Sequence, residues 1–108
     1  MAHDSSPEAL AVIEPHLPAA IERMSGRRFS TKRIIEQLRA TPEGESAYNE
    51  ALGYCAANQT DHMAHMVLHG QVVAELLRRS PLIRFGGFIH GEPDEDDGYC
   101  VPSWWIKV

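Results

Sequence analysis

The stretch that decides the fold lies at the end of the chain, where residues 82–90 read LIRFGGFIH and residues 99–108 read YCVPSWWIKV. Both segments are rich in aromatic and β-branched residues, which favour strands. The residues between them, 91–98, are polar and rich in turn formers, and Ser80-Pro81 ends any helix that precedes them. The pattern therefore predicts one antiparallel β-hairpin of residues 82–90 and 99–108, joined by a long loop.

Upstream of this hairpin, apolar residues recur at helical spacing. Four helix starts are marked by a serine or threonine that suits the N-cap position: Ser6, Ser30, Thr41 and Thr60. Pro15 and Pro18 predict a kink in the first helix, and the longest helix is expected over residues 61–79, with Gly70 as a point where it could break. We therefore expect a mainly α protein with a C-terminal antiparallel β-hairpin.

Length and composition limit the class of protein. The chain has 108 residues, of which 44% are hydrophobic, and this suits one modest globular core. No apolar run is long enough to span a membrane, and the first residues carry neither a basic nor an apolar leader segment. Two cysteines, Cys55 and Cys100, do not make a disulfide framework. We expect a cytoplasmic protein with reduced thiols.

Three segments, taken in order, resemble the winged helix-turn-helix family. They are FSTKRIIEQL at 29–38, GQVVAELLRR at 70–79 and WWIKV at 104–108. The resemblance implies a winged helix-like domain over residues 18–108, preceded by an N-terminal helical extension of residues 1–17. The long connection over residues 40–61 departs from the tight turn of the simplest members and implies an extra helix.

The resemblance also implies a function. Family members recognise the major groove of double-stranded DNA with one helix, here the one near His69 to Arg79, and place the wing on the adjacent backbone. The expectation is a small DNA-binding protein, acting as a homodimer in transcription regulation or as an accessory factor of a mobile element. Candidate DNA-binding residues are Arg27, Arg28, Lys32, Arg33, His69, Gln71, Arg78 and Arg79.

Charge supports this expectation only in part. The formal net charge is −5, yet residues 23–39 hold six basic residues and one acid. The loop of the predicted wing carries five carboxylates in residues 92–97, which phosphate would repel. Either the wing points away from DNA, or the same fold recognises a protein.

The alternative function is therefore a protein-interaction module, an inhibitor or adaptor with a basic protein partner. Strand alternation predicts that Arg84, Phe88, Tyr99 and Trp105 share an outer face, while Trp104 faces the core. We expect the Arg84 guanidinium to lie opposite Trp105 and stack on its indole, and residues 92–97 to form a free, solvated tip. The residues expected to make this surface are Arg84, Phe88, Glu92, Asp94, Glu95, Asp96, Asp97, Tyr99 and Trp105.

A third interpretation is an enzyme or metal protein built around three histidines. His62, His65 and His69 stand at i, i+3 and i+7, which places them on one helix face, where Cys55 or Cys100 could add a thiolate. The spacing is no recognised zinc signature, so a polar helix face with incidental histidines is favoured. Nothing resembles a nucleophile elbow or a phosphate loop. We therefore expect no catalytic residues, no metal and no cofactor.

Overall fold

The computed structural model describes residues 6–57 and 60–108, and it is mainly helical with a small antiparallel sheet. The helical elements are α1 (Pro7–Ile13), the 3-10 turn η1 (Glu14–His16), α2 (Leu17–Arg23), α3 (Thr31–Leu38), α4 (Pro42–Cys55), α5 (Asp61–Val67), the π-helical segment η2 (Leu68–Val73) and α6 (Ala74–Arg79). The strands are β1 (Arg28–Ser30), β2 (Ile83–Phe88) and β3 (Ser103–Lys107), and the 3-10 turn η3 (Pro93–Glu95) lies between β2 and β3.

The predicted helix caps are confirmed. The side chains of Ser6, Ser30, Thr41 and Thr60 each accept a hydrogen bond from the backbone N–H three residues later. These bonds satisfy donors that the first turn of a helix leaves unpaired. The kink at Pro15 is also present, because η1 separates α1 from α2.

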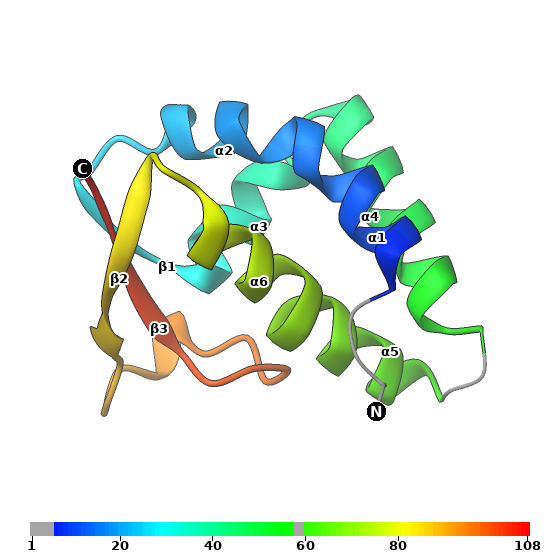
Figure 1. Ribbon diagram of the computed structural model, residues 1–108. Helices are drawn as coiled ribbons and strands as arrows, with labels where there is room; N and C mark the ends of the chain where they lie inside the picture. The colour runs from blue at the N-terminus through cyan, green and yellow to red at the C-terminus, as the bar shows by residue number, and fades with distance from the viewer. Residues whose placement is uncertain (1–5, 58–59) are drawn as a thin grey trace.

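The helix expected over residues 61–79 runs through without a break at Gly70. Its middle widens into the π-helical segment η2, so α5, η2 and α6 form one long helix that crosses the molecule from the sheet towards α4 (Figure 1). Residues 58 and 59, just before this helix, and residues 1–5 of the expected N-terminal extension lie outside the described residues.

The hairpin is present, and a strand that was not predicted joins it. β3 lies in the centre of a three-stranded antiparallel sheet with the order β1-β3-β2. The helix capped by Ser30 begins at Thr31 as predicted, and the residues just before it, Arg28–Ser30, form a strand that pairs with β3. A strand of three residues has too short a pattern to be recognised without its distant partner.

The expected faces of the second strand are wrong by one residue. Trp105 was placed outside and Trp104 inside, but Trp105 is only 3% exposed and its Nε1 donates to Thr31 Oγ1 over 2.8 Å. The register pairs Phe29 and Phe85 with Trp105, which places these three residues on the inner face. A one-residue slip of this kind exchanges the two faces of a strand.

A bulge in β2 also moves Phe88. The register shifts between Phe85 and Phe88, where Gly87 has a φ of +105° that favours glycine. Phe88 pairs with Ser103 and packs edge-on against Phe85, with 5.1 Å between ring centroids. Phe88 therefore leaves the outer face on which it was predicted and joins the inner side of the hairpin.

One hydrophobic core connects the α-helices, η2 and the three strands. It includes Ile13 of α1, Ile34 of α3, Tyr48 of α4 and Leu77 of α6, and Trp105 closes it beneath the sheet. None of the helices in residues 6–57 and 60–108 is both long and apolar enough to cross a membrane.

Candidate functional site

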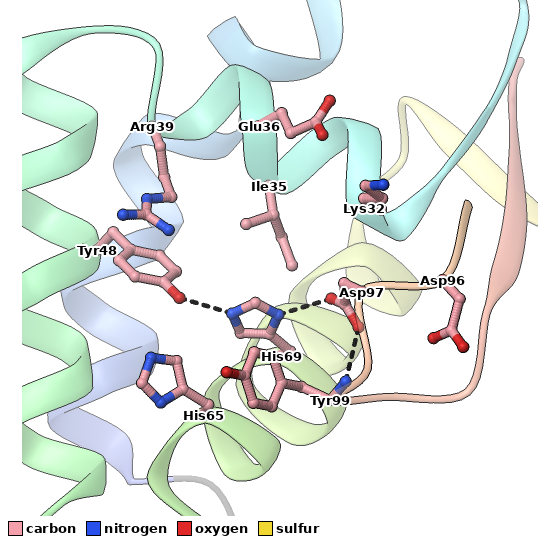
Figure 2. A pocket seen from close by; sticks show the side chains of 10 residues that line it. All are labelled: Lys32, Ile35, Glu36, Arg39, Tyr48, His65, His69, Asp96, Asp97 and Tyr99. Carbon is pink, nitrogen blue, oxygen red and sulfur yellow. Dashed lines mark hydrogen bonds and ion pairs between the residues drawn. The ribbon is translucent and has the colours of Figure 1, made fainter. Parts of the chain in front are cut away.

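A polar pocket of about 420 Å³ opens between α3, α4, the long helix and the loop that follows η3 (Figure 2). Its walls bring together basic, acidic and aromatic side chains from four parts of the chain. They are Lys32, Ile35, Glu36, Arg39, Tyr48, His65, His69, Asp96, Asp97 and Tyr99.

His69 lies at the centre of this pocket and bonds through both ring nitrogens. Its Nδ1 is 2.7 Å from Asp97 Oδ2, and its Nε2 is 2.7 Å from the Tyr48 hydroxyl. With Asp97 ionised and the ring neutral, His69 donates from Nδ1 to the carboxylate and accepts at Nε2 from the Tyr48 O–H. The side chains of His69 and Asp97 are only 6% and 11% exposed, so the chain of bonds lies almost out of water.

The surroundings fix the charges of this group. Burial alone would raise the pKa of Asp97, but hydrogen bonds from His69 and from the backbone N–H of Tyr99 outweigh it and lower that pKa. Burial raises the pKa of the Tyr48 hydroxyl. Burial and the neighbouring Asp97 raise the pKa of the Cys100 thiol to about 12. An ionised carboxylate therefore stands among a neutral phenol and a neutral thiol.

The backbone around His69 lets the loop that carries Asp97 lie close to the helix. His69 lies in the π-helical segment η2, and such segments are frequent at functional sites. The next residue, Gly70, leaves room for the loop, since a Cβ there would lie 3.5 Å from the Cβ of Cys100. The loop can therefore lie close against the helix.

The three histidines predicted on one face surround an aromatic ring. Tyr99 stacks on His65 with 4.8 Å between centroids, and it lies 5.6 Å from His62 and 5.1 Å from His69. Within the described part of the chain, no group of three or more His, Cys, Asp or Glu side chains is placed to hold a metal ion. Here the histidines pack against the loop.

The acidic loop is not the free tip that was expected. Glu95 accepts from Ser30 Oγ at 2.6 Å and from Arg33 Nη2 at 3.2 Å, and Lys32 donates to the Asp94 carbonyl at 2.7 Å. The bond from Ser30, together with Arg33, lowers the pKa of Glu95 despite some burial. Two of the five acids, Glu95 and Asp97, thus fasten the loop onto α3 and η2.

The outer face of the sheet carries arginine side chains and an aromatic ring. Arg28 and Arg84 flank Ile106 in one cross-strand row, and the Arg28 guanidinium lies 4.0 Å from the centre of the Trp104 ring. The stacking predicted for Arg84 on Trp105 is therefore made by Arg28 on Trp104. We call this surface, with the exposed Arg27 beside it, the basic face.

The other residues predicted to bind DNA do not form one surface. Arg33 is bound to Glu95 and Glu36, and Arg79 to Glu75. His69 is buried, so it cannot reach a base edge in this structure, whereas Gln71 and Arg78 are exposed on the long helix.

The residues expected for protein interaction do not form one surface. Trp105 is buried, Glu95 and Asp97 are bonded within the molecule, and Tyr99 is half-buried among the histidines. Of the remaining acids, Glu92, Asp94 and Asp96 are exposed. Arg84 and Phe88 lie on opposite sides of the hairpin.

Sequence reasoning missed Tyr48, Arg39 and Trp104. Nothing in the local sequence connects Tyr48 with a histidine 21 positions away. Arg39 lies over the Tyr48 ring at 4.2 Å and pairs with Glu45 at 2.7 Å. Thr41 and Pro42 predicted where α4 begins, and this start lies between Arg39 and Tyr48 in the sequence. The contact between these two side chains could not be predicted from it.

Comparison of the chain with protein-family models, with curated proteins and with solved structures finds no match. The winged-helix resemblance therefore depends on the order and pattern of the elements alone.

Proposed function

We propose that this protein binds double-stranded DNA through the basic face of its sheet. The observation that carries the proposal is a set of arginines without acidic partners. Among the described residues, Arg27, Arg28 and Arg84 make no ion pair with a carboxylate, although the protein has 15 acidic and only 10 basic residues. Arginines that are left free in an acidic protein suit an anionic partner.

The geometry of the basic face fits phosphate. A guanidinium offers several N–H donors in one plane and binds phosphate through two of them at once. The stacking of Arg28 on Trp104 orients that plane while its edge stays available. Arg28 and Arg84 stand on either side of Ile106, so they present two such donors along one row.

The fold gives further support. A sheet with the order β1-β3-β2, a helix just before the hairpin and a hairpin at the end of the domain are consistent with a winged-helix arrangement. In that family the wing lies on the DNA backbone. A small DNA-binding protein of this kind would serve as a regulator or as an accessory factor of a mobile element.

The proposed contact differs from the one that the resemblance implies. The long helix would have to enter the major groove near His69, but residues 97–100 lie along that part of it. Asp96 is exposed and lines the same pocket as His69, and the exposed Glu92 and Asp94 belong to the same loop, so these acids would repel phosphate. The basic face lies on the outer side of the sheet, and we therefore assign the contact to it.

The test compares two double variants that change the net charge equally. Binding of a labelled duplex is measured by fluorescence anisotropy over a series of salt concentrations. For Arg28→Gln with Arg84→Gln we expect weaker binding and a slope of log K against log salt that is shallower by about two phosphate contacts, at about 0.9 each.

The control, Arg33→Gln with Arg39→Gln, removes arginines that already pair with carboxylates, and it should change binding little. Equal losses in both double variants, or no binding of any duplex at low salt, would overturn the proposal.

A further inference from the structure

A second pocket lies on the opposite side of the sheet from the basic face. It has a volume of about 480 Å³ and runs between the inner side of the hairpin and the row Gly70, Ala74 and Arg78 of the long helix. Thr31, His69, Phe85, Phe88, Cys100, Val101, Ser103 and Trp105 complete its lining.

Three large apolar side chains of this pocket are exposed. Phe85, Phe88 and Val101 are 46%, 57% and 66% exposed, and all three line it. Large apolar side chains that gather around a concavity mark a binding site more often than an inert surface. The small residues Gly70 and Ala74 keep the opposite wall open.

The polar groups of the lining are already occupied or neutral. The Trp105 indole donates to Thr31, and both ring nitrogens of His69 are bonded to Tyr48 and Asp97. The Cys100 thiol, whose pKa is about 12, carries no charge at neutral pH. Arg78 is the one charged side chain among the described lining residues, and it has no carboxylate partner among the residues that the structure describes.

We infer that this pocket binds a small apolar molecule that carries a single carboxylate. Its apolar body would lie against Phe85, Phe88 and Val101, and its acid group would pair with Arg78. A pocket of this volume suits a small molecule, and ligand pockets typically combine apolar walls with a few polar groups that fix orientation. A bidentate pair between carboxylate and guanidinium would give that orientation.

The first test uses 3-phenylpropionate and its neutral match, 3-phenylpropanamide. Binding is followed by NMR through the indole N–H of Trp105, which the structure places at the pocket. We expect saturable binding of the acid and about tenfold weaker binding of the amide, since a hydrogen bond to a charged group is worth more than a neutral one. Absence of binding, or equal affinity for the two probes, would overturn the proposal.

Two variants locate the site. Arg78→Gln should bring the affinity for the acid down to that for the amide, whereas Arg39→Gln, in the polar pocket, should change neither. Ala74→Leu should fill the pocket and abolish binding of both probes. If Ala74→Leu does not fold, which loss of the Trp105 indole resonance would reveal, the Arg78 comparison alone decides.

A second copy of the chain could cover the same apolar wall, and sedimentation distinguishes this case. The proposal requires that the oligomeric state be the same for the parent protein and for Ala74→Leu. A dimer that dissociates in this variant would assign the pocket to a protein interface and overturn the proposal.

Discussion

At the scale of single residues, Asp97 holds the loop to the helices. Its carboxylate accepts from the His69 ring and from the backbone N–H groups of Tyr99 and Cys100. We expect Asp97→Asn to lower the free energy of unfolding at neutral pH by about 1–3 kcal/mol, because it weakens buried bonds to a charged group. Urea denaturation measures this, with Asp94→Asn as control, since Asp94 is exposed and bonds to Lys32 through its backbone carbonyl, which the substitution keeps.

The same residue predicts a pH dependence. The pKa of Asp97 in the folded protein is below its ordinary value of 3.8, so ionisation of this group favours folding. Its contribution is complete above that ordinary value and is lost as the pH falls through the lowered pKa. The stability difference between the parent protein and Asp97→Asn should therefore shrink on acidification. A difference that stays constant down to the acid unfolding transition would contradict the assignment.

Tyr48 provides the matching test on the other side of His69. Tyr48→Phe removes the hydroxyl that donates to Nε2 and leaves a buried acceptor without a partner, so we expect a loss of about 1–3 kcal/mol in unfolding free energy. Tyr54→Phe removes a hydroxyl from the same helix at a side chain that is 44% exposed, and it should change stability little. Equal effects would mean that the bond to His69 contributes nothing.

At the scale of elements, α4 contains two glycines with opposite roles. A Cβ at Gly44 would lie 1.8 Å from the Leu38 carbonyl oxygen, so Gly44→Ala must push α4 away from the end of α3. We expect a loss of about 1–3 kcal/mol, as in other overpacked sites. At Gly53 such a Cβ would meet no atom of another described element within 4 Å, and Gly53→Ala should stabilise the helix by about 0.5–1 kcal/mol. Thermal unfolding of both variants checks the prediction, and a destabilised Gly53→Ala would contradict it.

The elements with strong local signals could be predicted from the sequence. Capping residues such as Ser30 and Thr60 act on backbone groups three positions away, and the hairpin segments differ sharply in composition from the helices. β1 could not be predicted, because its pairing with β3 bridges more than 70 positions. The faces of β3 could not be predicted either, since adjacent tryptophans give no preference until Thr31 offers a partner to one of them.

Several residues of the candidate site could be predicted from the sequence, but the contacts between them could not. His65 and His69 were identified by their spacing along one helix face, and Asp97 as part of an acidic loop. Their relation to Tyr48 depends on how the loop folds back and on the wider turn of η2. Such long-range contacts follow from packing, which leaves no periodic trace in the sequence.

At the scale of the whole molecule, charge is divided between the loop and the basic face. Glu92→Gln, Asp94→Asn and Asp96→Asn together remove three exposed carboxylates and take the formal net charge from −5 to −2. We expect an unchanged melting temperature and tighter binding of duplex DNA at low salt, an effect that fades as salt screens the repulsion.

The other two acids of the loop supply the contrast. Glu95→Gln with Asp97→Asn should lower the melting temperature, because these carboxylates fasten the loop to Arg33 and His69. Calorimetry and anisotropy on both sets check the prediction. A loss of stability in the first set, or none in the second, would contradict this division of roles.

The strand order has a consequence for the nascent chain. β3 is the central strand, and it follows both of its neighbours in the sequence. While the polypeptide leaves the ribosome, β1 and β2 therefore have no strand partner until residues 103–107 emerge. The helices can pack before that moment, but the indole that closes the core and the arginine row of the sheet are completed together, when these residues emerge.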